Sequence, residues 1–213
     1  MDISQIVAQI IAFLFALSFH EAAHAWSANK LGDPTARDLG RITMNPLAHI
    51  DPIMTVLFPA MMIMAGLPPF GAAKPVPVDT RNLAHPKRDH AWIAAAGPIS
   101  NVILAVVSIA LMRMLSSGAP PFGWLPASVL DPVLLVLGWS IVVNLVLATF
   151  NIIPIPPLDG SWILSNVLTG SAERLYRSIQ PYGFLILIVL MWSGVLWRLL
   201  GPVVMFGLQL AAR

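Results

Sequence analysis

The stretch ISQIVAQIIAFLFALSFHEAAHAW, residues 3–26, decides the fold of this chain. It carries no charged residue from Ile3 to Phe19, and it is longer than the roughly 20 apolar residues that cross a bilayer as a helix. A secretory signal peptide would have a basic start and a small-residue cleavage site, and the sequence shows neither. We therefore expect this stretch to be a retained membrane helix.

The composition indicates that lipid covers much of the remaining surface. Hydrophobic residues make up 57% of the chain and charged residues only 10%, whereas soluble domains carry roughly a quarter charged residues. The net charge of +2 is small and the charges are clustered, which argues against a nucleic-acid-binding face. Because the chain has no cysteine, it forms no disulfide and offers no thiolate to a metal.

Alternating apolar and polar segments predict one transmembrane domain over residues 1–213, with an all-α polytopic fold. We expect a bundle of about four to six transmembrane helices, with a small β-hairpin or re-entrant segment after the first helix. The expected segments are a helix at 1–29, a loop on the cytoplasmic side at 30–90, helices at 91–115 and 129–152, a loop with a short helix at 153–180, and a C-terminal helix at 181–212.

Two features of the 30–90 region bear on topology. The apolar segment 53–67 is short for a full crossing and contains Pro59, so a tilted helix and a re-entrant segment both remain open. More than half of the charged residues lie between 30 and 90. By the positive-inside rule, this region faces the cytoplasm in a multi-pass protein of the cell membrane.

The motif His20-Glu21-Ala22-Ala23-His24 lies inside the first apolar stretch. Residues four apart share one face of a helix, so both imidazoles can bind one ion. Zinc accepts histidine nitrogen in a tetrahedral site, and a catalytic zinc keeps one position for water. Glu21 projects roughly 100° around the helix from His20, where its carboxylate can act as general base toward that water.

The alternative is that these are ordinary helix residues that match the motif by accident. With five histidines and few glutamates, the motif should arise in roughly one such chain in a thousand. Each charged side chain near the centre of a membrane helix also costs at least about 2.5–3.5 kcal/mol, which a bound metal would offset. Both arguments favour a metal site.

A third protein ligand is needed, and Asp159 is the best candidate. It follows Pro154, Pro156 and Pro157, which prevent a regular helix. Irregular backbone at membrane depth is tolerated where it is packed in protein or lines a wet cavity. The alternative is an interfacial loop in which Asp159 caps a helix that begins near Ser161.

Other residues carry weaker signals. Lys74-Pro75-Val76-Pro77-Val78 is interpreted as an edge strand, because the two prolines remove donors from one edge only. Its open edge, at Lys74, Val76 and Val78, would bind an unwound substrate by strand addition, although a proline-rich connector is the alternative.

Three further histidines, together with Gly97 and Asn101, are expected to have structural rather than catalytic roles. We expect His49 to be a solvated loop residue rather than a ligand, because its flanks are polar. His85 and His90 are interpreted as interfacial anchors. Gly97 and Asn101 are expected to serve close helix packing and a hydrogen bond across the bundle.

Taken together, these motifs carry a family resemblance. The HEAAH motif, followed downstream by Asn151-x-x-Pro154-x-x-x-x-Asp159-Gly160, resembles the site-2 protease family of intramembrane zinc metalloproteases. Residues 96–101 (AGPISN) resemble another recurring segment of that family. Residues 40–52 (GRITMNPLAHIDP) and 70–78 (FGAAKPVPV) are similar to its compact bacterial branch, which lacks PDZ and CBS domains.

The resemblance implies one Zn²⁺ per chain, bound by His20, His24 and Asp159, with Glu21 as catalytic base. It also implies that Asn151 lies near the scissile bond, where its amide would bind the substrate backbone or the oxyanion. The alternative role of Asn151 is to satisfy loop carbonyls that the prolines leave unpaired. The expected partners are single-span membrane proteins or leftover signal peptides in the lipid bilayer of a bacterial inner membrane, and not nucleic acid.

Two rival functions remain at this point. A membrane zinc carrier or sensor would need a line of ligands that continues across the membrane, and the later spans offer none. A catalytically inactive, protease-like binding module would not need Glu21, which is present.

Overall fold

The computed structural model describes residues 2–64, 71–118 and 125–212, and these are helical with irregular connections. Within these described residues, five helical segments are long and apolar enough to cross a membrane. They are α1 (Ile3–Lys30), α4 (Pro86–Ser116), α5 (Ala127–Asn151), the continuous run Gly170–Trp192, and α9 (Val195–Ala212). This confirms the all-α bundle and agrees with a multi-pass membrane protein.

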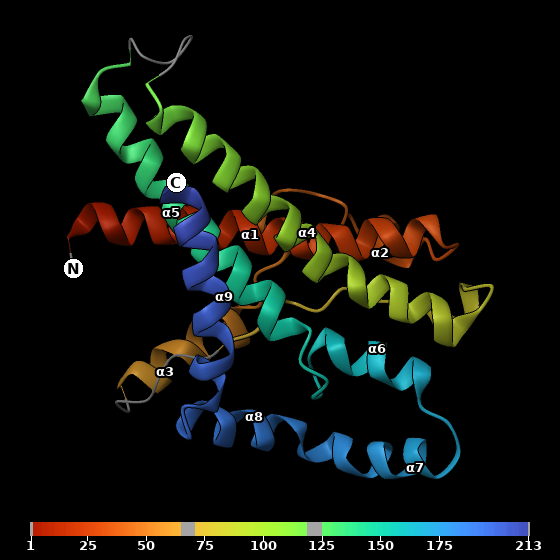
Figure 1. Cartoon of the computed structure of the whole chain (residues 1–213). Helices are drawn as coiled ribbons and strands as arrows, with labels where there is room; N and C mark the ends of the chain where they lie inside the picture. The colour runs from red at the N-terminus through yellow and green to blue at the C-terminus, as the bar shows by residue number, and fades with distance from the viewer. Residues whose placement is uncertain (1, 65–70, 119–124, 213) are drawn as a thin grey trace.

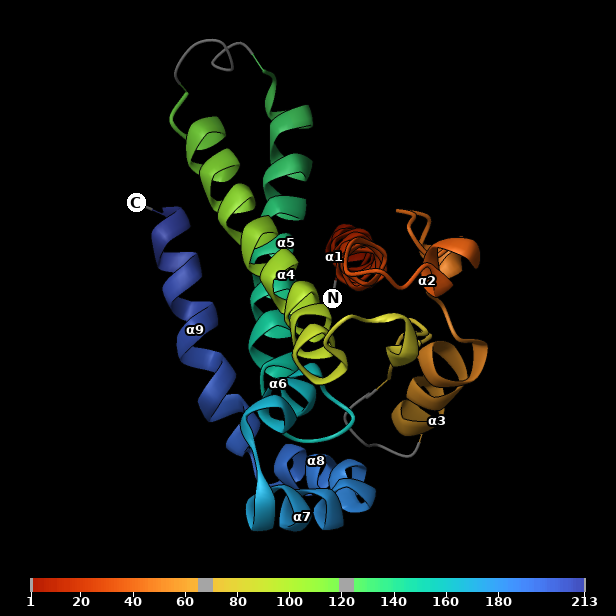
Figure 2. The same ribbon diagram turned by 90° about the vertical axis from the view of Figure 1, so that its right-hand side faces the viewer.

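Helix α4 lies at the centre of the bundle, where it packs against both α1 and α5 (Figures 1 and 2). Figure 2 shows α4, α5 and α9 running alongside one another, with α1 seen end-on beside them. Ala8, Ala12 and Ala16 form a buried stripe along α1 at a spacing of four residues. Such small residues let membrane helices approach closely.

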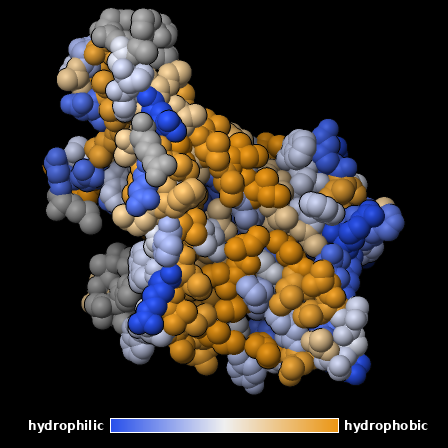
Figure 3. Space-filling view, viewed as in Figure 1, coloured by the Kyte–Doolittle hydropathy of each residue, from blue (hydrophilic) through white to orange (hydrophobic). Residues whose placement is uncertain are grey.

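The outer surface of the bundle is apolar. Ile6, Ile10 and Phe13 of α1 are exposed, as are Val102 and Val106 of α4. Figure 3 shows hydrophobic atoms over the middle of the molecule and hydrophilic atoms gathered at the right-hand edge. Figure 1 places α2 and the start of α4 at that edge. This distribution is typical of a protein whose sides contact lipid.

The shorter elements connect these segments or make up parts of them. They are α2 (Thr35–Asp38), η1 (Pro46–Ala48), η2 (Pro52–Leu57), α3 (Phe58–Met64), η3 (Thr80–Asn82), α6 (Asp159–Val167), α7 (Gly170–Ile179), η4 (Gln180–Tyr182) and α8 (Gly183–Trp192). Together, α7, η4 and α8 form the run Gly170–Trp192. The run η2–α3 would extend about 20 Å as a helix, which is short of the roughly 30 Å hydrocarbon core. Residues 65–67 of the predicted 53–67 segment lie outside the described part, so the re-entrant or interfacial interpretation of this segment stays a prediction.

The predicted β-hairpin is not found, since no strand occurs in the part of the chain that the structure describes. Residues 71–79 are irregular. The backbone groups of this segment bind elsewhere: the Lys74 amide donates to the His49 carbonyl at 2.9 Å, and Arg41 donates to the carbonyls of Lys74 and Pro75 at 2.5 and 3.3 Å. Because these backbone groups already hydrogen-bond to the Arg41 side chain and the His49 carbonyl, they are not free to form a β-ladder.

Asp33 fixes the end of this segment to the end of α1. Its fully buried carboxylate accepts hydrogen bonds from the amide and hydroxyl of Thr35, the amide of Asp79 and the side chain of Asn82. Burial by itself raises the pKa of Asp33, but these four bonds outweigh it and hold the pKa below its ordinary value.

We expect Asp33→Asn to destabilise the protein by about 1–3 kcal/mol, because an amide cannot accept all four bonds. A carboxylate with a lowered pKa stabilises the fold above its ordinary value near pH 4, and the contribution is lost as the pH falls through the folded-state value. The gap in melting temperature between wild type and Asp33→Asn, measured in detergent, should therefore narrow below about pH 4. A gap that does not change with pH would contradict this role.

Candidate metal centre

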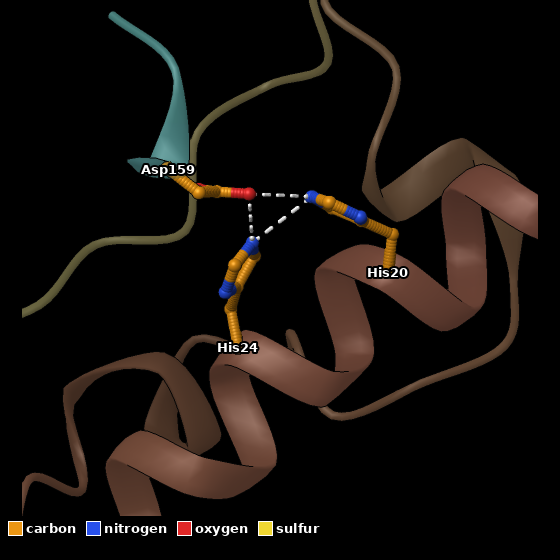
Figure 4. Close-up of side chains that lie close together, drawn as sticks. All are labelled: His20, His24 and Asp159. Carbon is orange, nitrogen blue, oxygen red and sulfur yellow. Dashed lines mark hydrogen bonds and ion pairs between the residues drawn. The ribbon is translucent and has the colours of Figure 1, made fainter. Parts of the chain in front are cut away.

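The side chains of His20, His24 and Asp159 converge at one point, and they come from α1 and from the start of α6 (Figure 4). The Nε2 atoms of His20 and His24 lie 3.0 Å apart. The Oδ2 atom of Asp159 lies 3.1 Å from His20 Nε2 and 3.4 Å from His24 Nε2. Ligand atoms of a tetrahedral zinc site lie about 3.3 Å apart, so the triangle has the right size.

Hydrogen bonds to the other ring nitrogens fix the tautomer of both histidines. His20 Nδ1 donates to the side-chain oxygen of Asn101 at 2.6 Å, and His24 Nδ1 donates to the backbone carbonyl of Ile93 at 2.7 Å. Each Nε2 atom therefore presents a lone pair. Asp159 Oδ2, which is buried and accepts no hydrogen bond, faces both. Three converging acceptors repel one another unless a cation binds between them, so these residues fit a metal ion.

Two glycines give this centre its space. A Cβ atom at Gly97 of α4 would collide with the His24 ring and lie 2.6 Å from His20 Nε2. A Cβ atom at Gly160 would collide with the Ile152 carbonyl, so this glycine lets Asp159 pack beneath the proline-rich loop. The predicted close packing at Gly97 is confirmed, and its purpose is to leave room for the two imidazoles.

A buried chain of hydrogen bonds supports the Asn101 side chain that binds His20 Nδ1. Asn101 donates to the Asn144 side chain at 2.8 Å. Asn144 in turn donates to the Ser140 carbonyl and hydroxyl, and the Ser140 hydroxyl pairs with that of Ser108 at 2.9 Å. Asn101 and Ser108 belong to α4 and Asn144 and Ser140 to α5, so the predicted hydrogen bond from Asn101 across the bundle is confirmed. The chain fixes the Asn101 amide so that its oxygen faces His20.

We expect Asn101→Ala to lower zinc affinity about 10–100-fold, because His20 Nδ1 then loses the acceptor that sets its tautomer. Asn101→Asp keeps an acceptor at the same place and serves as the control. Competition with a chromophoric chelator measures both affinities, and circular dichroism checks the fold. Equal zinc affinity in wild type and Asn101→Ala would show that the bond does not tune the metal centre.

The metal centre opens into a cavity of about 1000 Å³. Glu21 and Asn151 line it together with the three candidate ligands, and so do Val76 and Val78. The Asn151 amide donates to the carbonyl of Leu147 on its own helix at 3.0 Å. Lys74 is exposed and is not part of the cavity wall, so the structure brings only two of the three predicted substrate-segment residues to the site.

Two histidines differ from their sequence-based interpretation. His49 is completely buried rather than solvated: its Nε2 pairs with the Thr43 carbonyl at 2.9 Å, and its own carbonyl accepts a hydrogen bond from the Lys74 amide. His90 lies on the cavity wall and stacks on Trp162, whereas His85 is exposed. The spacing of His90 to Gly97, two turns along one helix face, is the sequence signal that could have placed His90 here.

Several apolar helices, a centre of two histidines and one carboxylate, and an adjacent glutamate define the class of membrane zinc metalloproteases. Comparison with known proteins agrees. A model of Peptidase family M50 matches residues 126–194, which include Asn151 and Asp159. The chain belongs to this family, that of the site-2 proteases, and is a zinc-dependent metalloendopeptidase.

Curated relatives extend the match to most of the chain. "Putative zinc metalloprotease YwhC" of Bacillus subtilis is 35% identical over 195 residues, covering 90% of this chain and 84% of that protein. "Putative zinc metalloprotease Rip2" of Mycolicibacterium smegmatis is 31% identical, covering 89% and 68%, and the Mycobacterium tuberculosis protein of the same name is 29% identical, covering 88% and 67%. No solved structure matches the chain significantly.

Proposed function

We propose that this metalloprotease hydrolyses peptide bonds within or beside transmembrane segments of its substrates, as in regulated intramembrane proteolysis. The observation that carries the proposal is the cavity at the metal centre. Its wall consists mostly of apolar side chains, and α1, α5 and α9, which are apolar enough to cross a membrane, each contribute to it. Such a wall suits an apolar peptide segment.

The residues at the cavity have distinct chemical tasks. Zinc held by His20, His24 and Asp159 would lower the pKa of a water molecule and polarise the scissile carbonyl. The carboxylate of Glu21 accepts the proton of the attacking water and returns it to the leaving amine. The remaining polar groups of the Asn151 side chain bind the substrate backbone or the oxyanion. The surrounding apolar side chains restrict access of bulk water.

A helical substrate hides its amides in its own hydrogen bonds, so it must unwind before cleavage. The segment with Val76 and Val78 lies on the cavity wall. Arg41 holds this segment by the carbonyls of Lys74 and Pro75. We therefore propose that residues 76–78 bind the unwound substrate. Lys74 lies outside the cavity wall, and its backbone amide and carbonyl are already paired with His49 and Arg41.

The proposed location is the bacterial inner membrane, with the metal centre toward the cytoplasm. Lys30 at the end of α1 and Lys87 and Arg88 at the start of α4 lie at one end of the bundle (Figure 1), and positive charge favours the cytoplasmic side. The proposed substrates are single-span membrane proteins or leftover signal peptides. A zinc carrier is disfavoured because, among the described residues, one group alone can hold a metal.

Proteoliposomes that contain the enzyme and a single-span protein test this proposal. Mass spectrometry should map the cut to the transmembrane segment or its edge, and a helix-breaking residue introduced near the cut should increase cleavage. A matched leucine substitution at the same position is the control. The proposal fails if the enzyme digests unfolded soluble proteins readily and leaves every transmembrane segment intact.

A further inference from the structure

A stacked pair of rings, His90 and Trp162, lines the same cavity as the metal centre. The ring centroids lie 4.2 Å apart, and the planes are inclined by 29°. His90 belongs to α4, and Trp162 belongs to α6. The pair therefore connects the helix that supports His24 to the helix that supplies Asp159.

Helical spacing places this pair close to the reacting groups. His90, Ile93 and Gly97 stand at i, i+3 and i+7, which puts all three on one face of α4. The Ile93 carbonyl orients His24, as described above. On α6, Trp162 follows Asp159 by three residues and shares its face. The pair therefore lies roughly one helical turn, about 5 Å, beyond the metal ligands.

His90 has unused hydrogen-bonding capacity. Besides the metal ligands, Glu21 and the tryptophans, the polar side chains on the described cavity wall are Thr55, Asn151 and His90. Thr55 and Asn151 already hydrogen-bond to backbone groups. The His90 side chain makes no hydrogen bond to any residue that the structure describes. A neutral imidazole offers one donor and one acceptor, and stacking holds their directions fixed.

An unwound peptide in this cavity has backbone groups that need hydrogen-bond partners such as the His90 ring. Its backbone amides and carbonyls have lost the hydrogen bonds of the helix. The apolar side chains on most of the cavity wall cannot replace those hydrogen bonds. An extended peptide rises about 3.3 Å per residue, so an offset of about 5 Å from the metal ligands corresponds to one or two residues along the substrate.

We propose that His90 is a substrate-binding residue that hydrogen-bonds the backbone of the unwound substrate one or two residues from the cut, while Trp162 holds its ring in position. This inference rests on the proposed function, because the ligand is the peptide that the enzyme cleaves. It assigns the α4–α6 side of the cavity to substrate binding, in addition to the 76–78 segment.

Binding to a catalytically inert enzyme tests this role without turnover. In the zinc-loaded Glu21→Gln background, the Kd of a fluorescent peptide from a cleaved substrate should rise about tenfold on adding His90→Phe, which keeps a stacking ring but has no hydrogen-bonding group. Adding His90→Gln, which restores a donor and an acceptor, should recover much of the affinity. Trp162→Phe is the matched control that keeps the stack.

Cleavage by the otherwise unaltered enzyme supplies the second measurement. Wild-type cleavage is measured first. Absence of cleavage by the wild type would contradict the proposed function, whereas the comparison of variants tests the role of His90 alone. His90→Phe should lower kcat/KM about tenfold, mainly through KM, with unchanged zinc content. Unchanged Kd and kcat/KM in His90→Phe would overturn the proposal, as would loss of zinc, because the residue would then act on the metal centre.

Discussion

Glu21→Gln is expected to keep its zinc and to lower cleavage by about 10²–10⁴-fold. The amide has nearly the same shape as the carboxylate but cannot accept a proton, and general base catalysis contributes about that factor. The three candidate ligands and the hydrogen bonds that orient both histidines do not involve Glu21. Metal binding should therefore survive the change.

Metal analysis and a gel-based cleavage assay on the same purified sample measure both quantities. Glu21→Asp is a useful control, because it keeps a carboxylate but retracts it by one methylene, and we expect intermediate activity. Normal turnover by Glu21→Gln would exclude Glu21 as the base and would require another proton acceptor on the cavity wall.

Asp159→Ala is expected to lose zinc and all measurable cleavage. The change leaves two histidine ligands, whereas a catalytic zinc site uses three protein ligands. Removal of a residue that merely supports a ligand already costs about 10–100-fold in affinity, so loss of a direct ligand should exceed about 100-fold. Equilibrium dialysis against buffered zinc measures the affinity.

Asp159→Asn is the matched variant for this prediction, because it keeps the side-chain shape and the position at the start of α6. We expect its zinc affinity to be weakened, since a neutral amide oxygen is a poorer ligand than a carboxylate. Full zinc occupancy in Asp159→Ala would assign the third ligand to another residue. It would then favour the alternative in which Asp159 serves only the start of a helix.

The sequence was informative wherever one segment alone determines a structure. The apolar residues of α1 predict a membrane helix, and the spacing of His20 and His24 on that helix predicts a shared ion. The contact of both with Asp159 could be expected from residue type, since the proline-rich loop before Asp159 needs a packed or wet environment. The helix and its histidine spacing require no knowledge of distant contacts, whereas Asp159 lies far away in sequence and is inferred from its residue type and its loop.

The incorrect expectations concern residues whose surroundings come from distant segments. His49 has polar neighbours in sequence, yet it is buried, and its carbonyl accepts a hydrogen bond from Lys74, about 25 residues downstream. The expected strand at 74–78 does not form. The buried guanidinium of Arg41 donates hydrogen bonds to backbone carbonyls of this segment that a β-ladder would need. The position of His90 depends on how α6 docks on α4, and the irregular loop before Asp159 sets that docking. Periodicity carries none of this information.

The most direct test of the central claim is zinc stoichiometry together with cleavage of a single-span protein, measured on the purified enzyme before and after chelation. The account predicts one zinc per chain, cleavage that disappears with the chelator and returns with added zinc, and no cleavage by Glu21→Gln at full zinc occupancy. A well-folded preparation that binds no zinc, or cleavage that persists without the metal, would contradict it.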